Sequence, residues 1–289
     1  MNKTDFWKNF SLGTELEISG NFIYNSLKII DTINNYDYPE EVFELLYNTS
    51  VGFERLMKIA IILLEHDGNN YKEVVNKKFE SHNLITLLDR IKKNSLYIGV
   101  SERAFLHLLS NFYKHIRYGR YSLNEENNYQ KDKDAFKHFI LKYLKTQDDN
   151  FRNTVEIKSF LLNIISKIAT ELYRVIKENA KRQNIDTYRL KPNGKAYQIF
   201  ILNDFSFENQ NRLKIELLIF LLNTKDLDIV KILKGIEPLH FDISNSKGLM
   251  KSILFEHNLN EYSDFLEHHY DELSNIEERL NILDFIWKV

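Results

Sequence analysis

The chain has 289 residues, of which 43% are hydrophobic and 28% are charged, so it can bury a sizeable core and is not a disordered protein. Its formal net charge of −2 excludes a generally basic nucleic-acid coat, and the absence of cysteine excludes disulfides, thiolate metal sites and cysteine nucleophiles. The first residues hold no apolar signal core, and no apolar run approaches the roughly 20 residues of a membrane span. We therefore expect a cytoplasmic protein without membrane contact.

Helical periodicity dominates the first third of the chain. Apolar residues at helical spacing predict one helix over residues 14–34 and a longer one from Pro39 to Glu65. Pro39 suits the first turn of a helix, because the missing N–H would have no partner there. Gly20 weakens the first helix by about 1 kcal/mol, so we expect a neighbouring element to pack closely against it.

Two further helices complete the predicted N-terminal unit. Residues 82–93 predict a short helix, and residues 101–121 predict the next. Four helices with short connections indicate a bundle over residues 1–121. The polar stretch 122–133 predicts a linker or long loop.

The remaining chain, residues 134–289, predicts a second helical domain of unknown role. Its predicted helices span residues 135–144, 154–183, 210–223, 227–234, 247–257, 261–273 and 276–287. Two strand-like runs flank KPNG and predict one short β-hairpin near 187–202, with Asn193–Gly194 in the turn. The predicted fold class is therefore mainly α, a helical bundle followed by a helical region that contains one hairpin.

Residues 101–121 contain most of the side chains that could bind a ligand or take part in catalysis. On a helical projection one side is apolar, and it comprises Phe105, Leu108, Leu109, Phe112, Tyr113 and Ile116. The opposite side carries Arg103, His107, Ser110, Lys114 and Arg117, with Asn111 and His115 on its flank and Tyr118, Arg120 and Tyr121 beyond. These residue types predict a face that contacts phosphodiesters. Cations can hold phosphate, imidazoles can move protons, and tyrosines can stack on bases. The alternative is a solvated basic face that pairs with acidic neighbours.

The sequence gives weaker evidence for a nucleotide-binding site or a metal site. No glycine-rich phosphate loop is present, and the chain predicts no cofactor. His268 and His269, with His257 upstream and a His240-x-Asp242 pair, could supply metal ligands. Adjacent histidines on a helix point about 100° apart and rarely share one ion, so we expect surface histidines and no metal.

Residues 50–121 resemble the HEPN superfamily, helical domains found with nucleotidyltransferases and in bacterial toxin and antiphage ribonucleases. The likeness rests on Glu54 and Lys58, four apart in SVGFERLMKIAIILLE, on His82–Leu84 at the start of a short helix, and on SNFYKHIRY. In helix order it extends over residues 14–121. The resemblance implies metal-independent RNA cleavage at a site shared by two protomers of a homodimer.

The family motif pairs an arginine and a following polar residue with a histidine four to six residues after the arginine. In SNFYKH, Asn111 takes the polar position and His115 the histidine position, but Ser110 stands where the arginine belongs. One reading makes Arg117 the substitute, with His115 as acid/base group, Asn111 positioning, and Arg103, His107, Lys114, Tyr118, Arg120 and Tyr121 binding RNA. The other reading is an inactive scaffold that binds RNA or a protein partner.

Overall fold

The computed structural model describes residues 1–80, 82–92, 96–116, 130–144, 151–223, 228–239, 248, 250 and 263–288. The described residues are mainly helical, as the sequence predicts. They form two compact units, residues 1–206 and residues 207–289. The division follows Ser206, whereas the sequence places the linker at residues 122–133.

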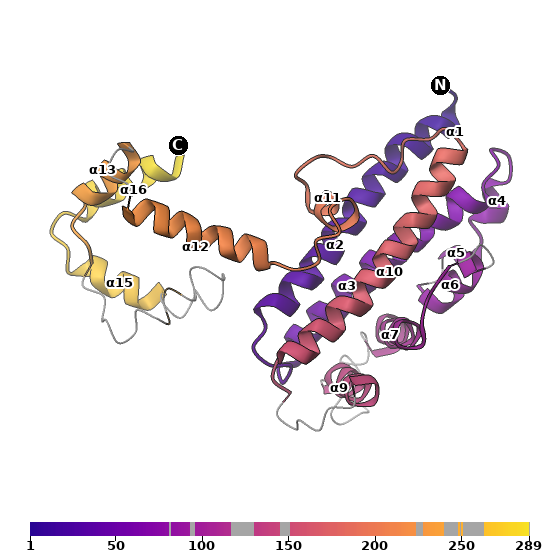
Figure 1. The fold of residues 1–289 in the computed structure, drawn as a ribbon, viewed down its shortest axis with the longest axis horizontal. Helices are drawn as coiled ribbons and strands as arrows, with labels where there is room; N and C mark the ends of the chain where they lie inside the picture. The colour runs from indigo at the N-terminus through magenta and orange to yellow at the C-terminus, as the bar shows by residue number, and fades with distance from the viewer. Residues whose placement is uncertain are drawn as a thin grey trace. The chain divides into compact units, whose positions relative to one another are not determined.

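Three long helices build the first unit: α2 (Leu12–Thr32), α3 (Pro39–Glu65) and α10 (Val155–Arg182). The middle helix, α3, packs along both α2 and α10 (Figure 1). Because α3 has neighbours on several sides, residues all around its second half are buried. Thr154 begins α10 as expected, since its hydroxyl accepts a hydrogen bond from the amide of Ile157 at 3.3 Å.

The predicted β-hairpin near 187–202 is wrong. Residues 195–200 form a short helix, α11 (Lys195–Phe200), which begins after a turn containing Asn193 in the left-handed region at φ 63°. Its buried residues Ala196, Ile199 and Phe200 recur at helical spacing, so the helix buries an apolar face that a strand would split between two sides.

Gly20 of α2 is the contact point for α11. A Cβ built on Gly20 would lie 2.3 Å from the Cβ of Ala196 and 2.5 Å from its Cα, which is closer than atoms can approach. The expected close packing at Gly20 is therefore confirmed. Helix α3 also approaches α2 closely. A Cβ on Gly52 of α3 would lie 2.8 Å from Ile23 Cγ1, and the Ser19 hydroxyl donates to the Gly52 carbonyl at 2.8 Å.

Shorter helices cover the other side of α3. They are α4 (Tyr71–Val74), α5 (Lys77–Glu80), α6 (Leu84–Lys92), α7 (Val100–Asn111) and α9 (Lys131–Leu144). Helices α6, α7 and α9 each contact α3 (Figure 1). Residues 131–133, predicted to be linker, belong to α9, and Asp132 is fully buried. Because α9, α10 and α11 pack with the N-terminal helices, residues 1–121 are not a separate compact unit.

The chain starts with α1 (Lys3–Phe6) and a π-helical turn, η1 (Trp7–Ser11). Lys8 is buried, and its ammonium donates to the His66 carbonyl at 2.8 Å and to the Gln183 side chain at 2.6 Å. Burial lowers the pKa of this amine, because the charged form loses its water. Lys8 thereby ties the first residues to the C-terminal ends of α3 and α10.

The second unit contains α12 (Glu208–Asn223), α13 (Asp228–Gly235), α15 (Ser263–Asp271) and α16 (Ile276–Lys288). Leu213, Leu217 and Phe220 of α12 are at least half exposed. Among the described residues, no helix combines the length and apolar character that crossing a bilayer requires.

Candidate functional site

Four residues of the predicted site share one exposed surface. His107 and Asn111 lie on α7, and Lys114 and His115 lie on the π-helical turn η2 (Phe112–Ile116) that continues it. All four are exposed, and none forms a hydrogen bond or ion pair within the described residues. We call these four residues the α7–η2 surface.

Arg103, the other predicted site residue that the structure describes, has a partner of its own. Arg103 is partly exposed and pairs with Asp89 of α6 at 3.2 Å. A further set, Arg117, Tyr118, Arg120 and Tyr121, lies outside the residues that the structure describes. The proposed compensation of Ser110 by Arg117 therefore stays a prediction.

The placement of Ser110 on the solvent side is wrong. Only 7% of Ser110 is exposed, and its hydroxyl donates to Asn83 Oδ1 at 3.1 Å. Because α6 and α3 both pack on α7, the buried arc of α7 is wider than a single apolar stripe. Phe105, Leu109 and Phe112 are buried as predicted, whereas Leu108, Tyr113 and Ile116 are partly exposed.

A carboxylate and an imidazole meet beside this helix, from two segments distant in the sequence. Glu54 lies in the middle of α3, and His82 precedes α6. The Nδ1 atom of His82 is 3.0 Å from both carboxylate oxygens of Glu54. The Glu54 side chain is 10% exposed, while the His82 side chain is 53% exposed. We call this pair the Glu54–His82 dyad.

The dyad fixes the tautomer of the imidazole. An ionised carboxylate can only accept hydrogen bonds, so Nδ1 carries the proton that points to Glu54. The Nε2 atom of the neutral ring then keeps its lone pair. Lys58, one turn along α3, donates to Oε1 of Glu54 at 2.7 Å and balances its charge. An imidazole that is half exposed and oriented by a buried carboxylate can accept a proton at Nε2.

The dyad opens into a cavity of about 340 Å³, the dyad pocket. Apolar walls come from Leu12, Ile59, Phe79 and neighbouring aliphatic side chains, and Tyr113 of η2 closes one side. The Tyr113 ring lies 5.1 Å from the His82 ring, between centroids. The π-helical turn thus brings one aromatic residue to the dyad and places the exposed Lys114 and His115 immediately after it. Turns of this type occur frequently at functional sites.

Sequence reasoning missed the dyad. Glu54, Lys58 and His82 served only as features of the family resemblance, and no pairing between them was predicted. The spacing of Glu54 and Lys58 is a local helical signal. The contact between Glu54 and His82 spans 28 residues, and no sequence pattern marks it.

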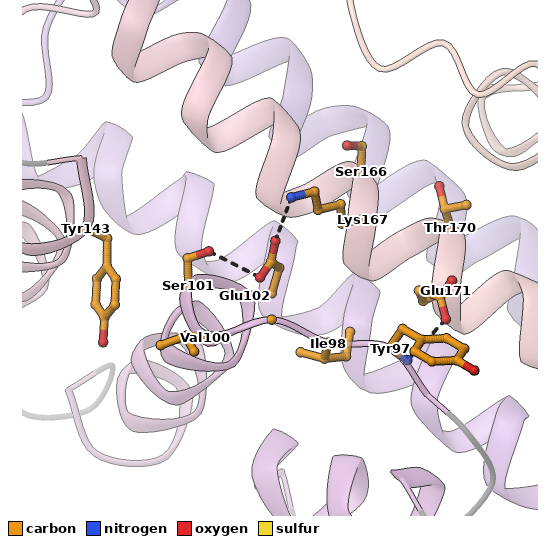
Figure 2. A pocket seen from close by; sticks show the side chains of 11 residues that line it. Tyr97, Ile98, Val100, Ser101, Glu102, Tyr143, Ser166, Lys167, Thr170 and Glu171 are labelled. Atoms are coloured by element: carbon orange, nitrogen blue, oxygen red, sulfur yellow. Dashed lines mark hydrogen bonds and ion pairs between the residues drawn. The ribbon is translucent and has the colours of Figure 1, made fainter.

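A second cavity of about 860 Å³ lies between the start of α7 and the middle of α10. Figure 2 shows that Glu102 points toward Lys167 and Ser101, each 3.2 Å from the carboxylate. Burial raises the pKa of the Glu102 carboxyl, but hydrogen bonds from its own amide, Lys167 and Ser101 outweigh this and hold it below its usual value. The Glu102 carboxylate therefore caps α7 and ties it to α10.

The histidines considered as metal ligands lie in the second unit. His268 is 3.6 Å from Glu272, and its ring centroid is 6.1 Å from that of His269. His240 and His257 fall outside the described residues. Within the described part of the chain, no three histidine or carboxylate side chains are grouped as metal ligands.

Comparison of the chain with protein-family models, with curated proteins and with solved structures finds no match.

Proposed function

We propose that this chain is an RNA-directed protein of bacterial conflict, a toxin or antiphage effector of the HEPN type. In this role the α7–η2 surface contacts the RNA backbone. The observation that carries the proposal is the grouping on α7 and η2 of four exposed residues that have no hydrogen bond or ion pair among the described residues: His107, Asn111, Lys114 and His115. An exposed ammonium without a carboxylate partner is available for phosphate, and exposed imidazoles can move protons.

In the leading form of the proposal the protein is a metal-independent endoribonuclease. His115 supplies acid/base chemistry, and Lys114 contacts phosphate. The resemblance implies that two protomers face each other across the site, so we expect a homodimer in solution.

Binding of a labelled, unstructured RNA over a range of salt concentrations tests the proposal. Lys114→Ala should weaken binding and lower the slope of log K against log salt by about 0.7, because one phosphate contact to a single strand is lost. Lys177→Ala is the matched control, since Lys177 is exposed on α10, away from η2. Equal salt slopes for both variants, or no RNA binding by the wild type, would refute the proposal.

Cleavage is tested separately with EDTA present. His115→Ala should slow cleavage by about 10²–10⁴-fold, the usual contribution of a general acid or base. Binding of the same RNA should change little by comparison.

A second candidate function is an inactive scaffold that binds RNA or a protein partner. It is favoured by Ser110, which is buried and bonded to Asn83 where the family resemblance calls for arginine. A wild-type protein that binds RNA, or co-purifies with a stoichiometric protein, but never cleaves RNA would support it.

A further inference from the structure

RNA cleavage without a metal needs two proton transfers. A base must take the proton of the ribose 2′-hydroxyl, and an acid must protonate the departing 5′ oxygen. The proposed function assigns acid/base chemistry to His115 alone. The dyad pocket contains a second imidazole whose environment suits the first of these transfers.

Three features of His82 fit a base. Its Nδ1 is held 3.0 Å from both Glu54 oxygens, so Nε2 keeps its lone pair. The carboxylate is almost fully buried, whereas half of the imidazole is exposed. A proton taken up at Nε2 creates an imidazolium that Glu54 stabilises at contact distance, as a buried carboxylate does for other catalytic histidines.

The surroundings of the dyad fit a ribonucleotide. The cavity of about 340 Å³ is in the size range of small-ligand sites. Phe79 and Tyr113 supply aromatic walls, and aromatic rings are the usual partners of bases in single strands. Lys58 uses one of its three N–H donors on Glu54, and the others can reach a phosphate oxygen.

The dyad also adjoins the α7–η2 surface along the chain. The His82 ring packs against Tyr113, and His115 follows two residues later. Residues two apart in a helical turn point to nearly opposite sides, so the His115 side chain lies outside the dyad pocket, which Lys58, His82 and Tyr113 line.

We propose that the Glu54–His82 dyad is the general base of an RNA-cleaving site, with His82 as a catalytic residue and Glu54 as its positioning residue. This inference rests on the proposed RNA-directed function. His82 Nε2 takes the proton of a ribose 2′-hydroxyl while that oxygen forms a bond to phosphorus. The bond from phosphorus to the 5′ oxygen breaks, and this oxygen takes a proton from water. The products are a 2′,3′-cyclic phosphate and a free 5′-hydroxyl.

The test uses the full chain in EDTA and compares His82→Ala with His138→Ala, an exposed histidine of α9 outside both sites. Single-turnover cleavage of an unstructured RNA gives the rate, and a 2′-deoxy analogue that cannot react gives the affinity. His82→Ala should cleave at least about 100-fold more slowly, with affinity for the analogue unchanged. Added imidazole should restore part of the rate, which it cannot do for a structural defect.

Two more variants separate chemistry from folding. His82→Gln keeps a polar side chain of similar size but lacks a proton-accepting nitrogen, so it should match His82→Ala in rate and keep wild-type helicity. Glu54→Gln should lower the cleavage rate constant and leave the affinity for the analogue in place.

Each other outcome has a distinct meaning. Wild-type rates in His82→Ala, or a slow variant that imidazole does not rescue, would overturn the assignment of the base and leave the RNA-directed function standing. Wild-type protein that binds RNA without cleaving it would likewise overturn the dyad proposal alone. Wild-type protein that binds neither RNA nor the analogue would refute the RNA-directed function and, with it, the role of His82.

Discussion

At the scale of single residues, the burial of Ser110 and the exposure of His82 both differ from what the sequence suggests. Ser110 occupies the motif position that should face a substrate, yet it is buried and bonded to Asn83. His82 marks the start of a short helix, yet its imidazole is half exposed and oriented by Glu54. The neighbouring residues His82 and Asn83 thus differ in environment, because Asn83 bonds to the buried Ser110 whereas the His82 side chain is 53% exposed.

Restoring the motif arginine is a prediction at this scale. Ser110→Arg should destabilise the protein by about 1–3 kcal/mol, because a large side chain is forced into packed space. It should not create or increase RNA cleavage, since the guanidinium begins from a buried position. Urea unfolding measures the free-energy change.

The neighbouring Asn111→Arg variant provides the control. Asn111 is exposed, so this change should alter the free energy of unfolding by no more than about 0.5 kcal/mol. If both arginine variants were equally stable, Ser110 would not be buried as described.

At the scale of elements, the fold depends on helices that approach closely where side chains are small. Ser19, Gly20 and Gly52 let α11 and α3 pack directly on α2. Close approach on both sides fixes α2 between its neighbours. Helix α3, which carries Glu54, also packs against α6. The dyad is therefore a consequence of the packing of α3.

A pair of glycine substitutions tests this packing. Gly20→Ala should destabilise the protein by about 1–3 kcal/mol, because its Cβ would overlap the Cα of Ala196 and α11 must move. Gly13→Ala lies in the same helix, where a Cβ would meet nothing nearer than 4.0 Å. That variant should be neutral or up to about 1 kcal/mol more stable, since alanine favours helix over glycine.

The two glycine variants are compared by urea unfolding under one set of conditions. A Gly20→Ala variant as stable as Gly13→Ala would show that α11 does not rest on α2 at this point.

At the scale of the whole molecule, the chain divides after Ser206 and not at the polar stretch after residue 121. Helices α9, α10 and α11 contribute apolar faces to the same core as α2, α3 and α7. Both proposed sites, the α7–η2 surface and the dyad pocket, lie within residues 1–206.

A shortened chain that ends at Ser206 should therefore fold by itself. We expect a helical protein with one cooperative thermal transition, because residues 1–206 form a compact unit. Circular dichroism during heating measures this. A chain ending at Tyr121 is the comparison, and it should unfold without cooperativity, since α10 no longer covers α3.

A non-cooperative melt for residues 1–206 would contradict the division into units. RNA binding by this shortened chain, compared with the full chain, shows in addition whether the second unit takes part in recognition.

The sequence alone determined the helical character and the course of the long helices. Apolar periodicity and local signals, such as Pro39 at the first turn of α3 and Thr154 before α10, depend only on neighbouring residues. The exposure of His107, Lys114 and His115 followed from the same periodicity. Gly20 also predicted a close helix contact, because glycine lowers the stability of a helix and close packing can offset this loss.

Only the tertiary structure decided which distant residues meet. Residues 195–200 have strand-like composition, and their helix is selected by the apolar contact with α2 at Gly20. Ser110 is buried because α7 packs against several helices, and a helical projection contains no information on how many neighbours a helix has. Glu54 and His82 are brought together by the packing of α3 against the segment before α6. Such a contact depends on the positions of whole helices, so no local pattern could predict it.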